Sequence, residues 1–119
     1  AMHTASGLLD DIRAGRGVPL ATAEAGLLKF LAFFGNPAPG REPIAGFSPH
    51  FDLGWLAVHL PRVRAYFSHR CYDSSTLRQL ARDLGRGDLV PTADAAHRAL
   101  ADCRAAAGMA RVVAGLLKN

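Results

Sequence analysis

Short apolar segments alternate with amphipathic ones along this chain, and the alternation limits the folds open to it. Two segments are short and bounded by turn residues, which predicts two strands: residues 43–47, and the end of residues 65–72 at roughly 69–72. Hydrophobic residues at helical spacing surround them and predict helices near residues 7–14, 22–34, 52–60, 74–84 and 94–117. Because strands joined through a helix run parallel, the sequence predicts a helix-rich α/β fold with a small, two-stranded parallel sheet.

Local signals predict where the helices begin and end. Hydroxyl side chains precede three of them and are expected to cap their first turns: Thr4 or Ser6, Thr22, and Ser74 or Ser75. Gly35 and Gly85 are expected to end helices, and Pro61 to end one or open the next turn. The apolar run over residues 25–35 predicts a buried helix.

Other apolar side chains carry two readings each. Phe51 and Trp55 are expected to pack in the core, with stacking on a nucleobase as the alternative. Cys71 and Cys103 stand apart without C-x-x-C spacing, which predicts reduced, partly buried thiols rather than a disulfide.

The length and composition indicate one small globular domain. With 119 residues, 50% of them hydrophobic, the chain is expected to form a single domain over residues 2–119, with Ala1 a remnant of tag removal. No apolar run approaches the roughly 18 residues of a membrane span, and the first residues lack a signal-peptide pattern. These features predict a cytoplasmic protein without a membrane partner.

Positive charge is concentrated in one stretch of the chain. Residues 62–86 hold six arginines and two aspartates, so this window alone equals the net charge of +4. A basic stretch suits a polyanionic partner such as nucleic acid. The alternative is a solvated helix face in an arginine-rich protein.

His97 and Asp102 form an H-x4-D pair near the start of an alanine-rich segment. On a regular helix they would lie about 140° apart, so they converge only if His97 sits at or before the helix start. An aspartate there could hold a metal while a neutral histidine accepts a proton from water. A capping or surface pair is the alternative.

Further blocks follow in order along the chain: Met2-His3-Thr4, Gly46-Phe47-Ser48 with Asp52, Tyr66-Phe67, Arg70, Asp73, Ser75-Thr76-Leu77, Leu80-Ala81-Arg82, and His97-Arg98-Ala99-Leu100 with Asp102. In content, order and spacing they resemble the oligoribonucleases, a family of DEDDh 3′–5′ exonucleases. The resemblance covers nearly the whole chain. It implies a partial ribonuclease-H-like (exonuclease) fold and an enzyme that degrades short oligoribonucleotides to nucleoside monophosphates.

The resemblance also implies roles for individual residues. Asp52 and Asp102 match catalytic carboxylates of a two-metal site for Mg²⁺ or Mn²⁺, and His97 matches the general base. The substrate-binding positions implied are His3, Ser48, Arg70 and Ser75, the last three around a 5′ phosphate. Asp52 stabilising a helix N-terminus, Ser75 as a plain cap and Arg70 as a surface charge are the alternatives.

Two departures from the family change what is expected. Phe47 stands where the family has asparagine, and the Asp-x-Glu pair that supplies two metal-binding carboxylates is absent from the 119 residues. We therefore expect a truncated chain, or a naturally shortened homologue, with weak or no activity alone. Because two strands are marginal without cover, a homodimer is expected to shield the sheet edge. A non-catalytic binder of 5′-phosphorylated oligonucleotides and a helical interaction module are the rival hypotheses.

Overall fold

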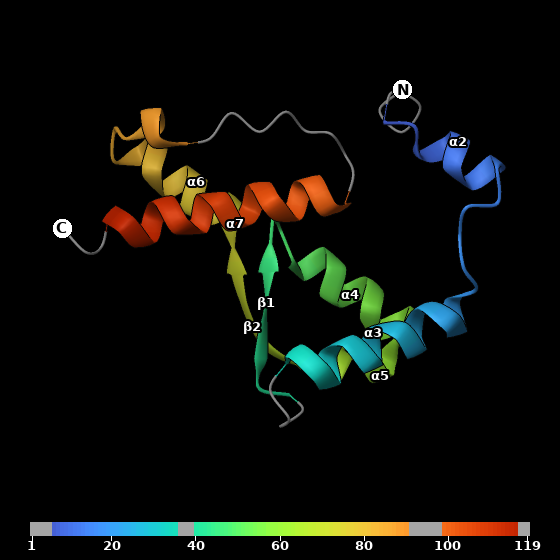
Figure 1. Ribbon diagram of the computed structural model, residues 1–119. Coiled ribbons are helices and arrows are strands. Elements are labelled where there is room, and N and C mark those ends of the chain that lie inside the picture. The colour runs from blue at the N-terminus through green and yellow to red at the C-terminus, as the bar shows by residue number, and fades with distance from the viewer. Residues whose placement is uncertain (1–5, 36–39, 91–98, 117–119) are drawn as a thin grey trace.

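The computed structural model describes residues 6–35, 40–90 and 99–116 (Figure 1). The elements follow in the order α2 (Leu8–Arg13), α3 (Leu20–Phe34), β1 (Glu42–Gly46), α4 (His50–His59), α5 (Pro61–Arg64), β2 (Phe67–Asp73), α6 (Ser74–Asp83), the 3₁₀ helix η1 (Gly87–Leu89) and α7 (Ala99–Leu116). The predicted alternation of helices and two strands is confirmed. The structure is a helix-rich α/β fold.

The two strands pair in parallel, as predicted. Glu42 is opposite Phe67 and Ile44 is opposite Cys71, so two steps along β1 correspond to four along β2. The extra residues form an irregularity in β2, where the Ser68 hydroxyl accepts a hydrogen bond from the Arg70 backbone N–H at 3.1 Å. Beyond it the register is regular, so Gly46 and Asp73 end the strands side by side.

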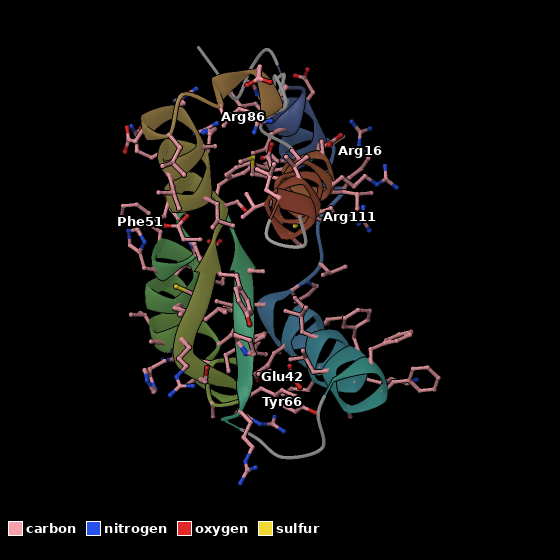
Figure 2. The ribbon with its side chains drawn as sticks, turned by 90° about the vertical axis from the view of Figure 1, so that its left-hand side faces the viewer. Arg16, Glu42, Phe51, Tyr66, Arg86 and Arg111 are labelled. Atoms are coloured by element: carbon pink, nitrogen blue, oxygen red, sulfur yellow. The ribbon has the colours of Figure 1, made fainter. Side chains whose placement is uncertain are left out.

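Helices cover both faces of this small sheet. Viewed along the sheet, α4 lies on one side and α3 and α7 lie on the other (Figures 1 and 2). α7 passes close to the end of β1 toward which both strands run (Figure 1). Parallel strands are normally covered on both faces, because their crossover helices lie there.

The core is small, and its buried side chains come mainly from α4, α5, α6 and α7. Its buried hydrophobic side chains are Leu53, Leu60, Val63, Ala81, Ala106 and Met109. Ser74, only 2% exposed, donates a hydrogen bond from its hydroxyl to the Ala106 carbonyl at 3.1 Å. This bond joins the first residue of α6 to the buried stripe of α7.

The prediction that α3 is a buried helix is wrong. Phe33 and Phe34 are 80% and 69% exposed, and no residue of α3 is buried. The helix is held by polar contacts at its edge: the Tyr66 hydroxyl donates to the Leu31 carbonyl at 2.9 Å, and Arg62 pairs with Glu24 at 3.7 Å. The apolar pattern correctly marked a helix, but no described element covers its aromatic side.

Expectations for four other side chains are also wrong. Phe51 and Trp55 were expected in the core and are 73% and 51% exposed on α4, where Trp55 stacks on His59 with ring centroids 4.6 Å apart. Cys71 and Cys103 are free, as predicted, but exposed rather than partly buried. With so few elements packed together, many apolar side chains remain at the surface.

Several helix ends differ from prediction. α3 begins after Pro19 instead of Thr22: Pro19 is the N-cap residue, in extended conformation, and its carbonyl accepts a hydrogen bond from the Ala23 backbone N–H at 3.0 Å. α2 begins after Gly7 without a side-chain cap, and Thr4 lies outside the described residues. Gly35 does end α3, but in extended rather than left-handed conformation.

Other helix ends match prediction. Gly85 follows α6 at φ 70°, and Pro61 opens α5. The predicted start of the last helix, at residue 94, lies outside the described residues.

Within the described ranges, none of the helices combines the length and apolar character that crossing a membrane requires.

Candidate functional site

The carboxyl ends of the two strands bring separate segments of the chain together. After β1 the chain turns through Phe47, Ser48 and Pro49 into α4, and after β2 it passes directly into α6. Because the strands are parallel and in register at this end, both turns lie at the same edge of the sheet. In open α/β sheets this is the edge at which ligands bind.

Asp73, the last residue of β2, is the centre of a hydrogen-bond cluster at this edge. Its Oδ1 accepts bonds from the backbone N–H of Ser48 at 3.0 Å and of Ser75 at 2.8 Å. Its Oδ2 accepts a bond from the Thr76 hydroxyl at 3.4 Å. Burial raises the pKa of the Asp73 carboxyl, but these hydrogen bonds outweigh it, so the pKa lies below its ordinary value.

The same cluster brings Ser48 and Ser75 together. Their hydroxyl oxygens lie 3.2 Å apart in a hydrogen bond, although the residues are 27 positions apart in the sequence. Ser48 has a φ of 53°, a left-handed conformation that residues other than glycine rarely adopt. Ser75 lies in the first turn of α6, where free backbone N–H groups favour anions. Two residues predicted to bind a phosphate are thus adjacent.

The cap of α6 was predicted wrongly. Ser74 and Ser75 were expected to cap the helix, but Asp73 does so, and both serines are inside the first turn. No role is therefore predicted for Asp73 from the sequence, although Asp73 is the centre of the cluster. The signal for it was an aspartate directly before Ser-Ser-Thr at a strand-to-helix junction, since aspartate caps helices at least as well as serine.

Arginine lies near this edge at two positions. Arg70 is exposed on β2, three residues before Asp73, and in the part of the chain that is described no hydrogen bond joins its side chain to Ser48 or Ser75. Arg78 of α6 lies over the Phe47 ring, with its guanidinium carbon 5.3 Å from the ring centroid. This stacking gives Phe47 a contact of its own.

The two predicted metal-binding carboxylates each lie in the first turn of a helix. Asp102 is half-buried in α7, four residues before Ala106, and so on the helix side that contacts Ser74. Asp52 is exposed in α4, one residue before the buried Leu53.

A metal site is not completed by these residues. Among residues 6–35, 40–90 and 99–116, no group of three or more histidine, cysteine, aspartate or glutamate side chains could hold an ion. Asp52 and Asp102 alone therefore do not make up the donor set of a two-metal centre. His3 and His97 lie outside the described residues.

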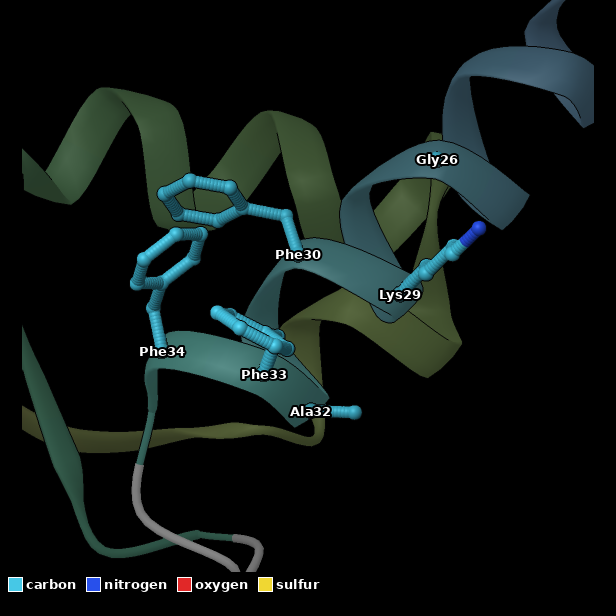
Figure 3. Close-up of a pocket in the computed structure, with 6 residues that line it drawn as sticks. All are labelled: Gly26, Lys29, Phe30, Ala32, Phe33 and Phe34. Carbon is cyan, nitrogen blue, oxygen red and sulfur yellow. The ribbon is translucent and has the colours of Figure 1, made fainter.

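A shallow hollow of about 300 Å³ adjoins the cluster, lined by Cys71, Tyr72, Asp73, Thr76 and Leu77. A larger hollow of about 480 Å³ lies on α3 among Phe30, Phe33 and Phe34 (Figure 3). All residues lining that larger hollow belong to a single helix, and apart from Lys29 they bring no polar side chain, so it offers no chemistry for a phosphate or a metal.

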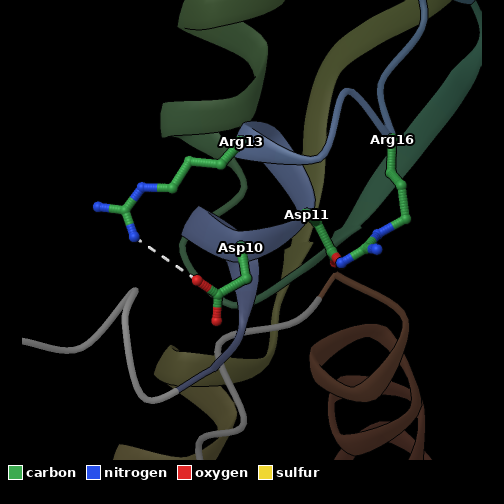
Figure 4. Close-up of polar contacts among 4 residues, drawn as sticks. All are labelled: Asp10, Asp11, Arg13 and Arg16. Atoms are coloured by element: carbon green, nitrogen blue, oxygen red, sulfur yellow. Dashed lines mark hydrogen bonds and ion pairs between the residues drawn. The ribbon is translucent and has the colours of Figure 1, made fainter.

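The ion pairs of Asp10 and Asp11, two residues of α2, involve neither the Asp73 cluster nor the predicted metal-binding carboxylates. Asp10 pairs with Arg13 at 3.5 Å, and Asp11 pairs with Arg16 at 2.7 Å (Figure 4). The first pair is largely exposed on both sides and contributes little to stability.

Comparison with known proteins gives consistent relatives. The chain is 39% identical over 105 residues to an oligoribonuclease of Streptomyces avermitilis, covering 87% of this chain and 51% of that protein. It is 36% identical over 109 residues to an oligoribonuclease of Rhodococcus jostii, covering 87% and 52%. It is 41% identical over 81 residues to that of Sodalis glossinidius, covering 67% and 42%. No family model matches. The chain spans about half the length of the curated relatives it matches.

Proposed function

Because this chain is a homologue of bacterial oligoribonucleases over most of its length, we propose that the protein is an exoribonuclease of the same kind. Its substrates would be short oligoribonucleotides, shortened from the 3′ end with release of nucleoside monophosphates. The homology supports the helix-rich α/β assignment as a partial ribonuclease-H-like fold. We also propose that residues 2–119 act as one exonuclease-like domain in the cytoplasm.

The contact between Ser48 and Ser75 is the observation that carries this proposal. The two hydroxyls come from different segments and lie 3.2 Å apart beside the N-terminus of α6. Hydroxyl donors next to a helix N-terminus suit a terminal phosphate dianion. We propose that Ser48 and Ser75 bind the 5′ phosphate of a short oligonucleotide, with Arg70 supplying positive charge and His3 lying near the substrate.

We propose that Asp52 and Asp102 contribute carboxylates to a site for Mg²⁺ or Mn²⁺, and that His97 is the general base. The remaining ligands would come from outside the described residues, since two carboxylates hold Mg²⁺ only weakly. The 119-residue chain alone is therefore expected to hydrolyse RNA slowly or not at all.

The decisive experiment is hydrolysis of a 5′-phosphorylated diribonucleotide by this chain in the presence of Mn²⁺, compared with the Asp102→Ala variant. Turnover that disappears in the variant would support an enzyme in which Asp102 takes part. Turnover that persists unchanged in the variant would contradict the role of Asp102. Binding without turnover would support the phosphate site and leave this chain without a working metal centre.

A second candidate function is non-catalytic binding of short 5′-phosphorylated oligonucleotides. Two observations on the described residues favour it: Ser48 and Ser75, the predicted phosphate-binding pair, are in contact, whereas the ligands for a metal ion are incomplete. Binding of the dinucleotide in the absence of metal, abolished by Arg70→Ala, would support it. A helical interaction module, the third possibility, would neither bind nor cleave.

A further inference from the structure

Asp73 accepts three hydrogen bonds, two more than a helix cap requires. Capping α6 needs only the bond from the Ser75 backbone N–H to Oδ1. The same oxygen also accepts the Ser48 backbone N–H at 3.0 Å, from the turn that follows the other strand. The carboxylate thus connects the two segments that carry the paired hydroxyls.

The backbone at Ser48 shows why such a connection matters. A left-handed φ of 53° is unfavourable for a serine, because the Cβ atom comes close to the following carbonyl oxygen. Such a conformation persists only when the surrounding structure holds it, and strain of this kind concentrates at functional sites. Among the contacts that hold it here are the bonds of Ser48 to Asp73 and Ser75, together with the bond from the Phe51 backbone N–H to the Ser48 carbonyl at 3.1 Å.

We propose that Asp73 is a positioning residue, which fixes the Ser48 turn against the first turn of α6 so that both serine hydroxyls face one phosphate. This inference rests on the proposed function, because it takes Ser48 and Ser75 as the phosphate-binding pair. Asp73 does not itself bind the phosphate: Oδ1 accepts two backbone N–H groups and Oδ2 accepts the Thr76 hydroxyl.

Two substitutions separate positioning from capping. Asp73→Asn keeps a side-chain carbonyl oxygen at the same distance from the backbone, so it preserves both bonds. In Asp73→Ser the serine can still cap α6, but its side chain is one atom shorter and cannot bond to the Ser48 backbone N–H at the same time. Both variants should therefore fold with a similar α6, and only the second should release the Ser48 turn.

The measurement is calorimetric titration of the 119-residue chain with a 5′-phosphorylated diribonucleotide in the absence of metal. Asp73→Asn should bind within about threefold of the unmodified chain. Asp73→Ser and Ser48→Ala should each bind about tenfold more weakly, the effect of losing a hydrogen bond to a charged group. Adding Asp73→Ser to Ser48→Ala should weaken binding little further, since Asp73→Ser acts by misplacing the Ser48 hydroxyl, which Ser48→Ala has already removed.

The outcomes distinguish the two ideas. Loss of binding in Ser48→Ala but not in Asp73→Ser would overturn the positioning role and leave the phosphate site in place. Equal losses in Asp73→Asn and Asp73→Ser, or full additivity with Ser48→Ala, would also overturn it, because a capping or charge effect would explain them. Absence of binding by the unmodified chain would overturn the proposed function, and the positioning role with it.

Discussion

At the scale of single residues, the turn at Ser48 is the most informative feature. Its left-handed backbone is unusual for serine, and its N–H and hydroxyl are both bonded to residues at the start of α6. A chain selected only for stability would be expected to place glycine there, since glycine adopts this conformation without steric cost. The serine side chain therefore indicates a use for the hydroxyl.

The backbone strain at Ser48 leads to a stability prediction. Ser48→Gly and Ser48→Ala both remove the hydroxyl, but only glycine relieves the left-handed conformation. We expect the free energy of unfolding of Ser48→Gly to exceed that of Ser48→Ala by about 1 kcal/mol. Urea denaturation of the two variants measures the difference, and equal stabilities would show that Ser48 is not strained in solution.

The lowered pKa of Asp73 leads to a pH prediction. A carboxyl whose pKa is lower in the folded than in the unfolded protein stabilises the fold at pH values above its ordinary pKa of 3.8. This contribution is lost as the pH falls through the pKa of the folded state. The unmodified chain should therefore exceed Asp73→Asn in unfolding free energy from neutral pH down to about 5, with the gap closing in more acid solution. Urea denaturation at a series of pH values tests this, and a gap independent of pH would contradict it.

At the scale of elements, the contact between α6 and α7 organises the site. Ser74 begins α6 and bonds to Ala106 in α7, and Asp102 lies one helical turn before Ala106. The packing that buries Ala106 and Met109 thus also places Asp102, a predicted catalytic carboxylate, on the side of α7 that contacts the start of α6, where Ser75 lies.

Removing the bond between α6 and α7 should cost measurable stability. Ser74→Ala deletes a buried hydroxyl and its hydrogen bond, so the free energy of unfolding should fall by about 1 kcal/mol. Ser68→Ala is the matched control, because its hydrogen bonds are exposed and its loss should cost less than about 0.5 kcal/mol. Thermal or urea denaturation compares the two, and equal losses would argue against the contact between α6 and α7.

At the scale of the whole molecule, incomplete cover is the dominant property. Among the described residues each of the two strands pairs along one side only, and α3 exposes Phe30, Phe33 and Phe34. Exposed strand edges and large apolar patches mark surfaces that pack against other polypeptide. This agrees with a chain that spans about half the length of its relatives.

The homodimer proposed to cover the sheet edge gives a prediction at this scale. Sedimentation equilibrium should show a dimer at micromolar concentration. Tyr72→Lys, on the exposed β2, should weaken the dimer because a lysine on an edge strand opposes strand pairing. Ile12→Lys, at a similarly exposed position on α2, should leave it unchanged. A monodisperse monomer of the unmodified chain would contradict the proposal.

Local features of the sequence were enough to predict the fold class, the order of the main helices and strands, and the family of the relatives. Hydrophobic spacing and turn residues are local signals, so β1, β2 and the helix after each strand could be predicted to within a few residues. The blocks from Met2-His3-Thr4 to His97 and Asp102, taken together in their order, indicated the oligoribonucleases.

Which of these residues meet, and which apolar side chains are covered, depends instead on how distant segments pack together. The bonds from Ser48 to Asp73 and Ser75 depend on the register of two parallel strands that are distant in sequence. The exposure of Phe33 and Trp55 depends on which elements pack against their helices. A hydrophobic pattern records that one side of a helix is apolar, but burial requires a second surface, which lies elsewhere in the chain or in a partner.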